Sequence, residues 1–216
     1  MPPAAPELVV LRIPKQRPLF EYQLSQLARL LPEQTTVLAA GMDKHLSPHT
    51  AAILERYIGP AQRHRGQHKA RLFSAIRDER SAPAYTGIAT YHSEALSAEL
   101  CGLANVFSRE KLDMGTRFLL EQLHTLAPVE TLIDLACGNG ILGLVALKQG
   151  VASNIVFCDE SAMAVRSASL NASRIFPQEA RNVSFLQGDG LLEYRKKPAQ
   201  IILCNPPFHM QHTVDD

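Results

Sequence analysis

The stretch that decides the fold is TLIDLACGNGILGLVALK, residues 131–148. It begins with an apolar run, Thr131 to Asp134, that is typical of a buried strand, and Gly140 to Lys148 has the composition of a helix. The turn between them contains Gly138 and Gly140, and glycines allow a backbone to approach a ligand closely. A strand, a glycine turn and a helix in this order predict one unit of a parallel α/β sheet.

The chain continues the same alternation on both sides of this unit. Further strands are predicted at 154–158, 183–186 and 201–204, with a helix at 161–175 and an amphipathic helix at 112–126. Because parallel strands are joined by helical crossovers, the pattern predicts a doubly wound, parallel sheet.

Acidic side chains lie at or after three of these strands. Asp134 precedes the glycine turn, where a carboxylate repels a pyrophosphate but attracts a ligand that carries an ammonium group. Asp159 ends the next strand, where an acid can accept both hydroxyls of a ribose. Asp189, in a Gly-Asp-Gly sequence, can accept from an adenine amine. Taken singly, each acid is equally typical of a cap or a turn.

The sequence Asn205-Pro206-Pro207-Phe208 directly follows the last predicted strand. The two prolines stiffen the backbone and leave the carbonyls of Asn205 and Pro206 without competing donors. With the side-chain oxygen of Asn205, they can bind both hydrogens of an exocyclic amine and aim its nitrogen at an electrophile. Phe208 offers a flat face for a base. A proline turn after a buried strand explains the prolines but not the flanking Asn and Phe.

Together these motifs resemble class I S-adenosylmethionine-dependent methyltransferases, and more narrowly the ribosomal RNA guanine-N2 methyltransferases of the RlmG/RsmC group, with the large-subunit branch nearest. The resemblance is close from about residue 103 onwards and is carried by residues 105–109, 112–118, 134–143, 156–165 and 203–209. It implies a Rossmann-like α/β sheet, S-adenosylmethionine as cofactor, and methylation of the N2 amine of a guanine in 23S rRNA.

The resemblance also implies which residues form the site. Those expected to bind the methyl donor are Phe107, Ser108, Arg109, Asp134, Ala136, Gly138, Gly140, Asp159 and Asp189. The guanine is expected at Asn205, Pro206, Pro207 and Phe208. Ala136 stands where the family usually has glycine, which narrows the turn. No metal is expected, since the four cysteines lack metal spacing, and we interpret them as buried thiols in a reducing cytoplasm.

The resemblance further implies two methyltransferase-like domains. Residues 1–84 would be the later strands of a degenerate, non-catalytic domain, 85–104 a linker or hairpin, and 105–216 the first half of the catalytic domain. The last strands of that domain would lie beyond Asp216, so we expect a truncated chain. The pattern of residues 8–80 itself predicts alternating strands and helices, at 8–13, 20–31, 35–40, 47–58 and 69–76.

Composition limits the partners. Lys+Arg 22 against Asp+Glu 21 gives a net charge of +1, so contact with RNA requires a local patch. The cluster Arg63, Arg65, Lys69 and Arg71 is a candidate for contacting phosphates, and equally for a solvated strand edge. No apolar run approaches the roughly 20 residues of a membrane helix and no signal peptide is apparent, so we expect a cytoplasmic monomer with ribosomal RNA as its partner.

Two alternatives remain open. The same chemistry could act on 16S rRNA, on an adenine amine in DNA or on a glutamine amide in a protein, because an Asn-Pro-Pro-aromatic sequence serves all of these amines. Alternatively, the chain is a catalytically incomplete fragment that binds RNA. Transfer assays with each acceptor distinguish these hypotheses.

Overall fold

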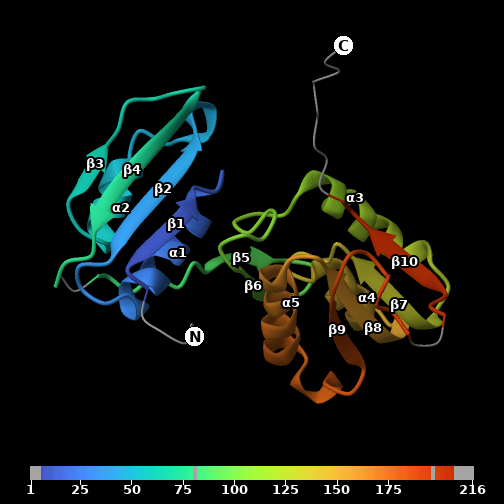
Figure 1. The fold of residues 1–216 in the computed structure, drawn as a ribbon. Coiled ribbons are helices and arrows are strands. Elements are labelled where there is room, and N and C mark those ends of the chain that lie inside the picture. Colours follow the sequence, from blue (N-terminus) through green and yellow to red (C-terminus); the bar gives the residue numbers. More distant parts are fainter. Residues whose placement is uncertain (1–5, 80–81, 196–197, 207–216) are drawn as a thin grey trace, which may run out of the picture. The chain divides into compact units, whose positions relative to one another are not determined.

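The computed structural model describes residues 6–79, 82–195 and 198–206 (Figure 1). The chain divides into two compact units, Met1–Gly87 and Ile88–Asp216. The longest helices that the structure describes have 14 residues, too short to cross a bilayer, which requires roughly 20.

The first unit contains a four-stranded mixed sheet in the order β1-β2-β4-β3. Its elements are β1 (Leu8–Arg12), α1 (Arg17–Leu30), β2 (Thr36–Met42), a 3-10 turn (Asp43–His45), α2 (Thr50–Tyr57), β3 (Ala61–Arg63) and β4 (Ala70–Ile76). Strands β1 and β2 are parallel, whereas β4 runs antiparallel to both β2 and β3. The predicted alternation of helices and strands is confirmed, but the short strand β3 was not predicted, because its sequence Ala-Gln-Arg has no apolar pattern.

The second unit contains an all-parallel sheet in the order β10-β7-β8-β9 (Figure 1). Its strands are β7 (Val129–Leu135), β8 (Ala152–Asp159), β9 (Val183–Gln187) and β10 (Ile201–Cys204). Its helices are α3 (Met114–Gln122), α4 (Ile141–Lys148) and α5 (Ala162–Ile175), with 3-10 turns at Leu123–Thr125 and Pro177–Glu179. The hairpin β5 (Ala89–Ser93) and β6 (Ala98–Gly102) precedes them. The predicted Rossmann-like parallel sheet is therefore confirmed.

The central strands of this sheet are covered on both faces. Ile155 and Phe157 of β8 belong to the main core with most of α4, whereas Val156 and Cys158 pack in a second cluster on the opposite face. Gly143 allows α4 to approach β8 closely, since a Cβ there would lie 2.5 Å from the Phe157 ring. Burial on both faces explains why these strands read as continuous apolar runs.

The cysteines are free thiols, as expected, but one of them is not buried. Cys101, Cys137 and Cys158 are buried, whereas Cys204 is exposed. Cys204 alternates with Leu203 on β10, which is an edge strand of the sheet in the described part of the chain. Ile202 is also exposed, which indicates that this face of β10 is uncovered among the described residues. The prediction of burial was therefore wrong for Cys204.

We expect Gly143→Ala to destabilise the second unit by about 1–2 kcal/mol. The new methyl would overlap Phe157 and Ile155, and overpacking of this kind outweighs the better helix propensity of alanine. Urea unfolding measures the change. Gly188→Ala is the matched control, because its Cβ would meet only the Glu193 side chain, at 3.4 Å. Equal unfolding midpoints for Gly143→Ala and the wild type would contradict the argument.

Candidate active site

The parallel sheet places the four sequence motifs at the carboxyl ends of its strands. Asn205 and Pro206 follow β10, residues 136–140 follow β7, Asp159 ends β8, and Asp189 follows β9. The register aligns the ends of neighbouring strands, Cys204 with Leu135, Leu135 with Cys158, and Asp159 with Gln187. The carboxyl ends of strands in an open α/β sheet are where such folds bind their ligands.

The turn after β7 has an unusual backbone. Ala136, Gly138 and Gly140 adopt left-handed conformations, with φ of 55°, 55° and 84°. At Gly140 a side chain is also excluded by space, since a Cβ would lie 2.9 Å from the Cβ of Ala168. At Ala136 the left-handed conformation costs about 1–2 kcal/mol relative to glycine. Alanine at position 136 therefore has two expected effects: its methyl group narrows the turn, and its left-handed backbone is strained.

Asp159 holds this turn in place. Its Oδ2 accepts the N–H of Gly138 at 3.0 Å, and its Oδ1 accepts the N–H of Ser161, the N-cap residue of α5, at 2.9 Å. The N–H of Cys137 also donates to the carbonyl of Cys158. The carboxylate is partly exposed, and each oxygen can still accept from a ligand.

Asp134 lies deeper than the sequence suggested. Its side chain is 1% exposed, and Oδ2 accepts the N–H of Gly143 in α4 at 2.9 Å. Burial raises the pKa of this carboxyl to about 8. The hydrogen bond from Gly143 lowers the pKa, and the negative charge of Asp159 raises it by a smaller amount. A contact between Asp134 and a ligand ammonium stays a prediction, whereas the contact that the structure shows is with helix α4.

Asn171 of α5 connects the turn to the hairpin, and sequence reasoning missed it. Its side chain is fully buried, its Oδ1 accepts the N–H of Cys101 at 2.9 Å, and its Nδ2 donates to the carbonyls of Cys101 (2.8 Å) and Asn139 (2.9 Å). Its neighbours on the buried helix face, Ala168 and Ala172, are apolar. Ser167 is the other polar residue buried on that face, and an Asn on a buried helix face was the available indication, because a buried amide requires partners.

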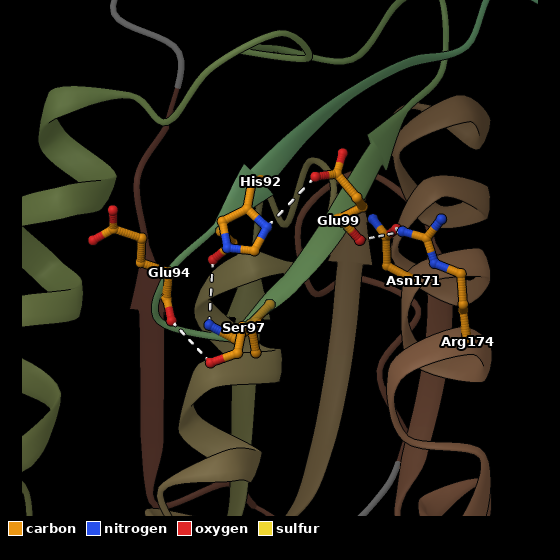
Figure 2. Close-up of polar contacts among 8 residues, drawn as sticks. His92, Glu94, Ser97, Glu99, Asn171 and Arg174 are labelled. Atoms are coloured by element: carbon orange, nitrogen blue, oxygen red, sulfur yellow. Dashed lines mark hydrogen bonds and ion pairs between the residues drawn. The ribbon is translucent and has the colours of Figure 1, made fainter.

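Two further contacts support this connection, and a third joins the two strands of the hairpin. The Nδ2 of Asn139 donates to the hydroxyl of Tyr91 in β5 at 3.1 Å. Figure 2 shows Arg174, one turn after Asn171 on α5, reaching the Glu99 carbonyl of β6. His92 and Glu99 pair across the hairpin at 3.5 Å. The hairpin is therefore hydrogen-bonded both to the turn and to α5.

The segment before the sheet lies close to the turn. Val106 is buried, and its Cγ1 lies 3.9 Å from where a Cβ of Gly138 would be, which is ordinary contact. Phe107 is exposed, and Ser108 has a left-handed backbone. Arg109 packs against Gly102 of β6 and pairs with Glu110 at 3.3 Å. Donor binding by Phe107, Ser108 and Arg109 stays a prediction.

Of the residues predicted to bind the guanine, the structure describes Asn205 and Pro206. Asn205 is half-buried, and its Nδ2 donates to Asp113 Oδ2 and Thr116 Oγ1, each at 2.9 Å. Pro206 and, beyond β9, Asp189 are exposed. Pro207 and Phe208 lie outside the described residues, so their predicted roles are not tested. Within the described ranges, no cluster of His, Cys, Asp and Glu is suited to hold a metal ion.

We expect the stability of the wild type, relative to Asp134→Asn, to fall as pH rises. The Asp134 pKa of about 8 in the folded chain exceeds the value near 4 of an unfolded aspartate, so folding binds a proton between these pH values. The asparagine keeps an oxygen for Gly143 and does not titrate. The difference should decline by at most about 1.4 kcal/mol per pH unit up to pH 8 and then level off. Urea unfolding across this range measures it, and a constant or growing difference would contradict the burial of the carboxyl.

Comparisons with known proteins agree with this geometry. The family model described as methyltransferase small domain matches residues 97–216, and the one described as RLMG N-terminal domain matches residues 1–79. The ribosomal RNA large subunit methyltransferase G of Yersinia enterocolitica is 38% identical over 99% of this chain, and that of Yersinia pestis is 37% identical over 99%. The chain spans 54% of the length of each relative.

A solved structure shares the fold. The 16S rRNA N2 methyltransferase RsmC of T. Thermophilus, in complex with AdoMet and guanosine, has a TM-score of 0.78 and 23% sequence identity to this chain. The match covers 96% of this chain and 57% of that one. The second unit therefore has the class I methyltransferase fold, and the chain belongs to the methyltransferase small domain family.

Proposed function

We propose that this chain transfers the methyl group of S-adenosylmethionine to the N2 amine of a guanine in ribosomal RNA, with 23S rRNA as the substrate. One observation carries the proposal. The turn after β7, Asp159, Asp189 and Asn205 all lie at the carboxyl ends of the strands of one parallel sheet. The names of the Yersinia relatives support the large-subunit RNA as the substrate, and the guanosine in the RsmC complex supports guanine as the base.

The residues of the donor side fit a nucleoside with a cationic amino acid end. The space beside Gly138 is open, since a Cβ there would touch only Val106, and two of the three left-handed positions of the turn, Gly138 and Gly140, carry no side chain. Asp159, at the strand end, would bind the ribose, and the exposed Asp189 would bind the adenine. When bound, S-adenosylmethionine supplies a methyl group on a sulfonium, which is electrophilic without further activation.

The acceptor side would position the amine. The Asn205 oxygen and the Pro206 carbonyl accept its two hydrogens and leave the nitrogen lone pair directed at the methyl group. The new N–C bond would form as the S–C bond breaks and leaves a neutral thioether, and the methylated nitrogen would then lose a proton to solvent as the product leaves the site. No strong base is needed, because the proton becomes acidic once the nitrogen is methylated. The enzyme's contribution is therefore placement and exclusion of water.

We expect Asn205→Ala to lower methyl transfer to 23S rRNA by about 100-fold or more, because one acceptor that orients the amine is lost. Donor affinity, measured by calorimetric titration with S-adenosylmethionine, should stay unchanged. Transfer is measured with a tritiated methyl group, followed by identification of the labelled base. Equal transfer by the wild type and Asn205→Ala would refute this role.

The other acceptors are outcomes of the same assay. Label in 16S rRNA, in a DNA adenine or in a release-factor glutamine would replace the proposed substrate. Asp159→Ala is the donor-side control and should lose saturable donor binding, because the ribose acceptor and the Gly138 contact go together. Donor binding by the wild type without transfer to any acceptor would support the alternative of a catalytically incomplete RNA-binding fragment.

The first unit, we propose, is a degenerate methyltransferase-like domain that contacts RNA. Arg63, Arg65 and Lys69 lie on and after β3 and are exposed, whereas Arg71 pairs with Asp43 at 2.9 Å. The three exposed cations carry the proposed phosphate contact, because the carboxylate of Asp43 offsets the charge of Arg71.

We expect the triple variant Arg63→Ala, Arg65→Ala, Lys69→Ala to weaken rRNA binding and to reduce its salt dependence. Each lost phosphate contact lowers the slope of log affinity against log salt by roughly one. Fluorescence anisotropy at several salt concentrations measures both quantities. A matched control replaces Arg12, Lys15 and Arg29, exposed cations of the same unit that change the net charge equally. Identical slopes for the two triple variants would show that the cluster is an ordinary charged edge.

A further inference from the structure

The side-chain amide of Asn205 is held by the first turn of α3, a helix whose contacting residues lie 92 and 89 positions earlier in the sequence. Its Nδ2 donates to Oδ2 of Asp113, the N-cap residue of α3, and to Oγ1 of Thr116 in that helix, at 2.9 Å each. Figure 1 shows α3 beside the end of β10. Both hydrogens of the amide are therefore engaged, and only its oxygen is left to accept from a ligand.

The charge of Asp113 determines which end of the amide faces it. The Thr116 N–H donates to Asp113 Oδ2 at 3.0 Å, and this hydrogen bond holds the pKa of the carboxyl below its usual value. An ionised carboxylate only accepts hydrogen bonds. A flipped amide would set the Asn205 oxygen against this negative charge, which is repulsive. The oxygen is therefore the end that stays free.

Gly115 provides the space for this arrangement. A Cβ at this position would lie 2.9 Å from Asn205 Oδ1 and 3.1 Å from Asp113 Oδ2. Glycine inside a helix is unfavourable relative to alanine, and its φ here is not left-handed, so conformational freedom does not explain it. The need for room beside the Asn205 oxygen does explain it.

We propose that Asp113 and Thr116 are positioning residues that hold Asn205 as an obligate hydrogen-bond acceptor, so that the site selects an exocyclic amine over a carbonyl oxygen. The proposal rests on the proposed role of Asn205 in methyl transfer. A helix cap alone does not account for the geometry, because the cap needs only the bond from the Thr116 N–H. The two bonds to Asn205 are additional.

The first test compares Thr116→Val with Thr116→Ser. Valine matches the shape of threonine without the hydroxyl, whereas serine keeps the acceptor for Asn205. We expect Thr116→Val to lower kcat for rRNA methylation by about tenfold with unchanged donor affinity, and Thr116→Ser to restore most of it. Equal kcat for the two variants would overturn the proposal, since a merely structural role of Thr116 predicts no rescue by the hydroxyl.

The second test covers Asp113 and does not depend on activity. Asp113→Ser keeps a helix cap but withdraws the carboxylate from Asn205. The side-chain amide of Asn205, observed by nitrogen-15 NMR in the wild-type chain, should show two exchange-protected hydrogens, with protection reduced in Asp113→Ser and Thr116→Val. An unprotected amide in the wild type would overturn the positioning. Protection without methyl transfer in the wild type would instead refute only the proposed function.

Discussion

Hydrogen bonds from main-chain N–H groups to two strand-end carboxyls are the constraint on which the candidate site depends. Asp159 holds Gly138, and Asp134 holds Gly143. The turn that leads from β7 into α4 has three left-handed residues, Ala136, Gly138 and Gly140, and these bonds support it. One of the two carboxyls, that of Asp134, is buried enough that its protonation is coupled to folding.

The two halves of the site have separate supports. The turn rests on α4, α5 and the hairpin, whereas Asn205 rests on the first turn of α3. Strand order joins them, since β7 and β10 are neighbours in the sheet. A substitution in one support can therefore disturb the turn or Asn205 without disturbing the other.

Local patterns predicted the elements, and distant contacts explain what was missed. The helices and the parallel strands of the second unit follow from apolar periodicity, and the motifs at strand ends follow from the parallel order. Periodicity gives no direction, so the antiparallel course of β4 was not predicted. The partners of Asn205 lie 92 and 89 positions away and those of Asn171 up to 70, so no local pattern pairs them. The burial of Asp134 likewise depends on α4 packing over the strand.

The contacts of Asn171 have a consequence for how this sequence can change over time. All three of its close amide hydrogen bonds go to main-chain atoms of Cys101 and Asn139. Any residue other than proline at position 101, and any residue at position 139, provides the same main-chain groups, so these hydrogen bonds do not fix the side chain at either position. Position 171 has no such freedom, because only an amide of this length donates twice and accepts once in the same buried space. In these three hydrogen bonds, the requirement for a particular side chain therefore falls on position 171 alone.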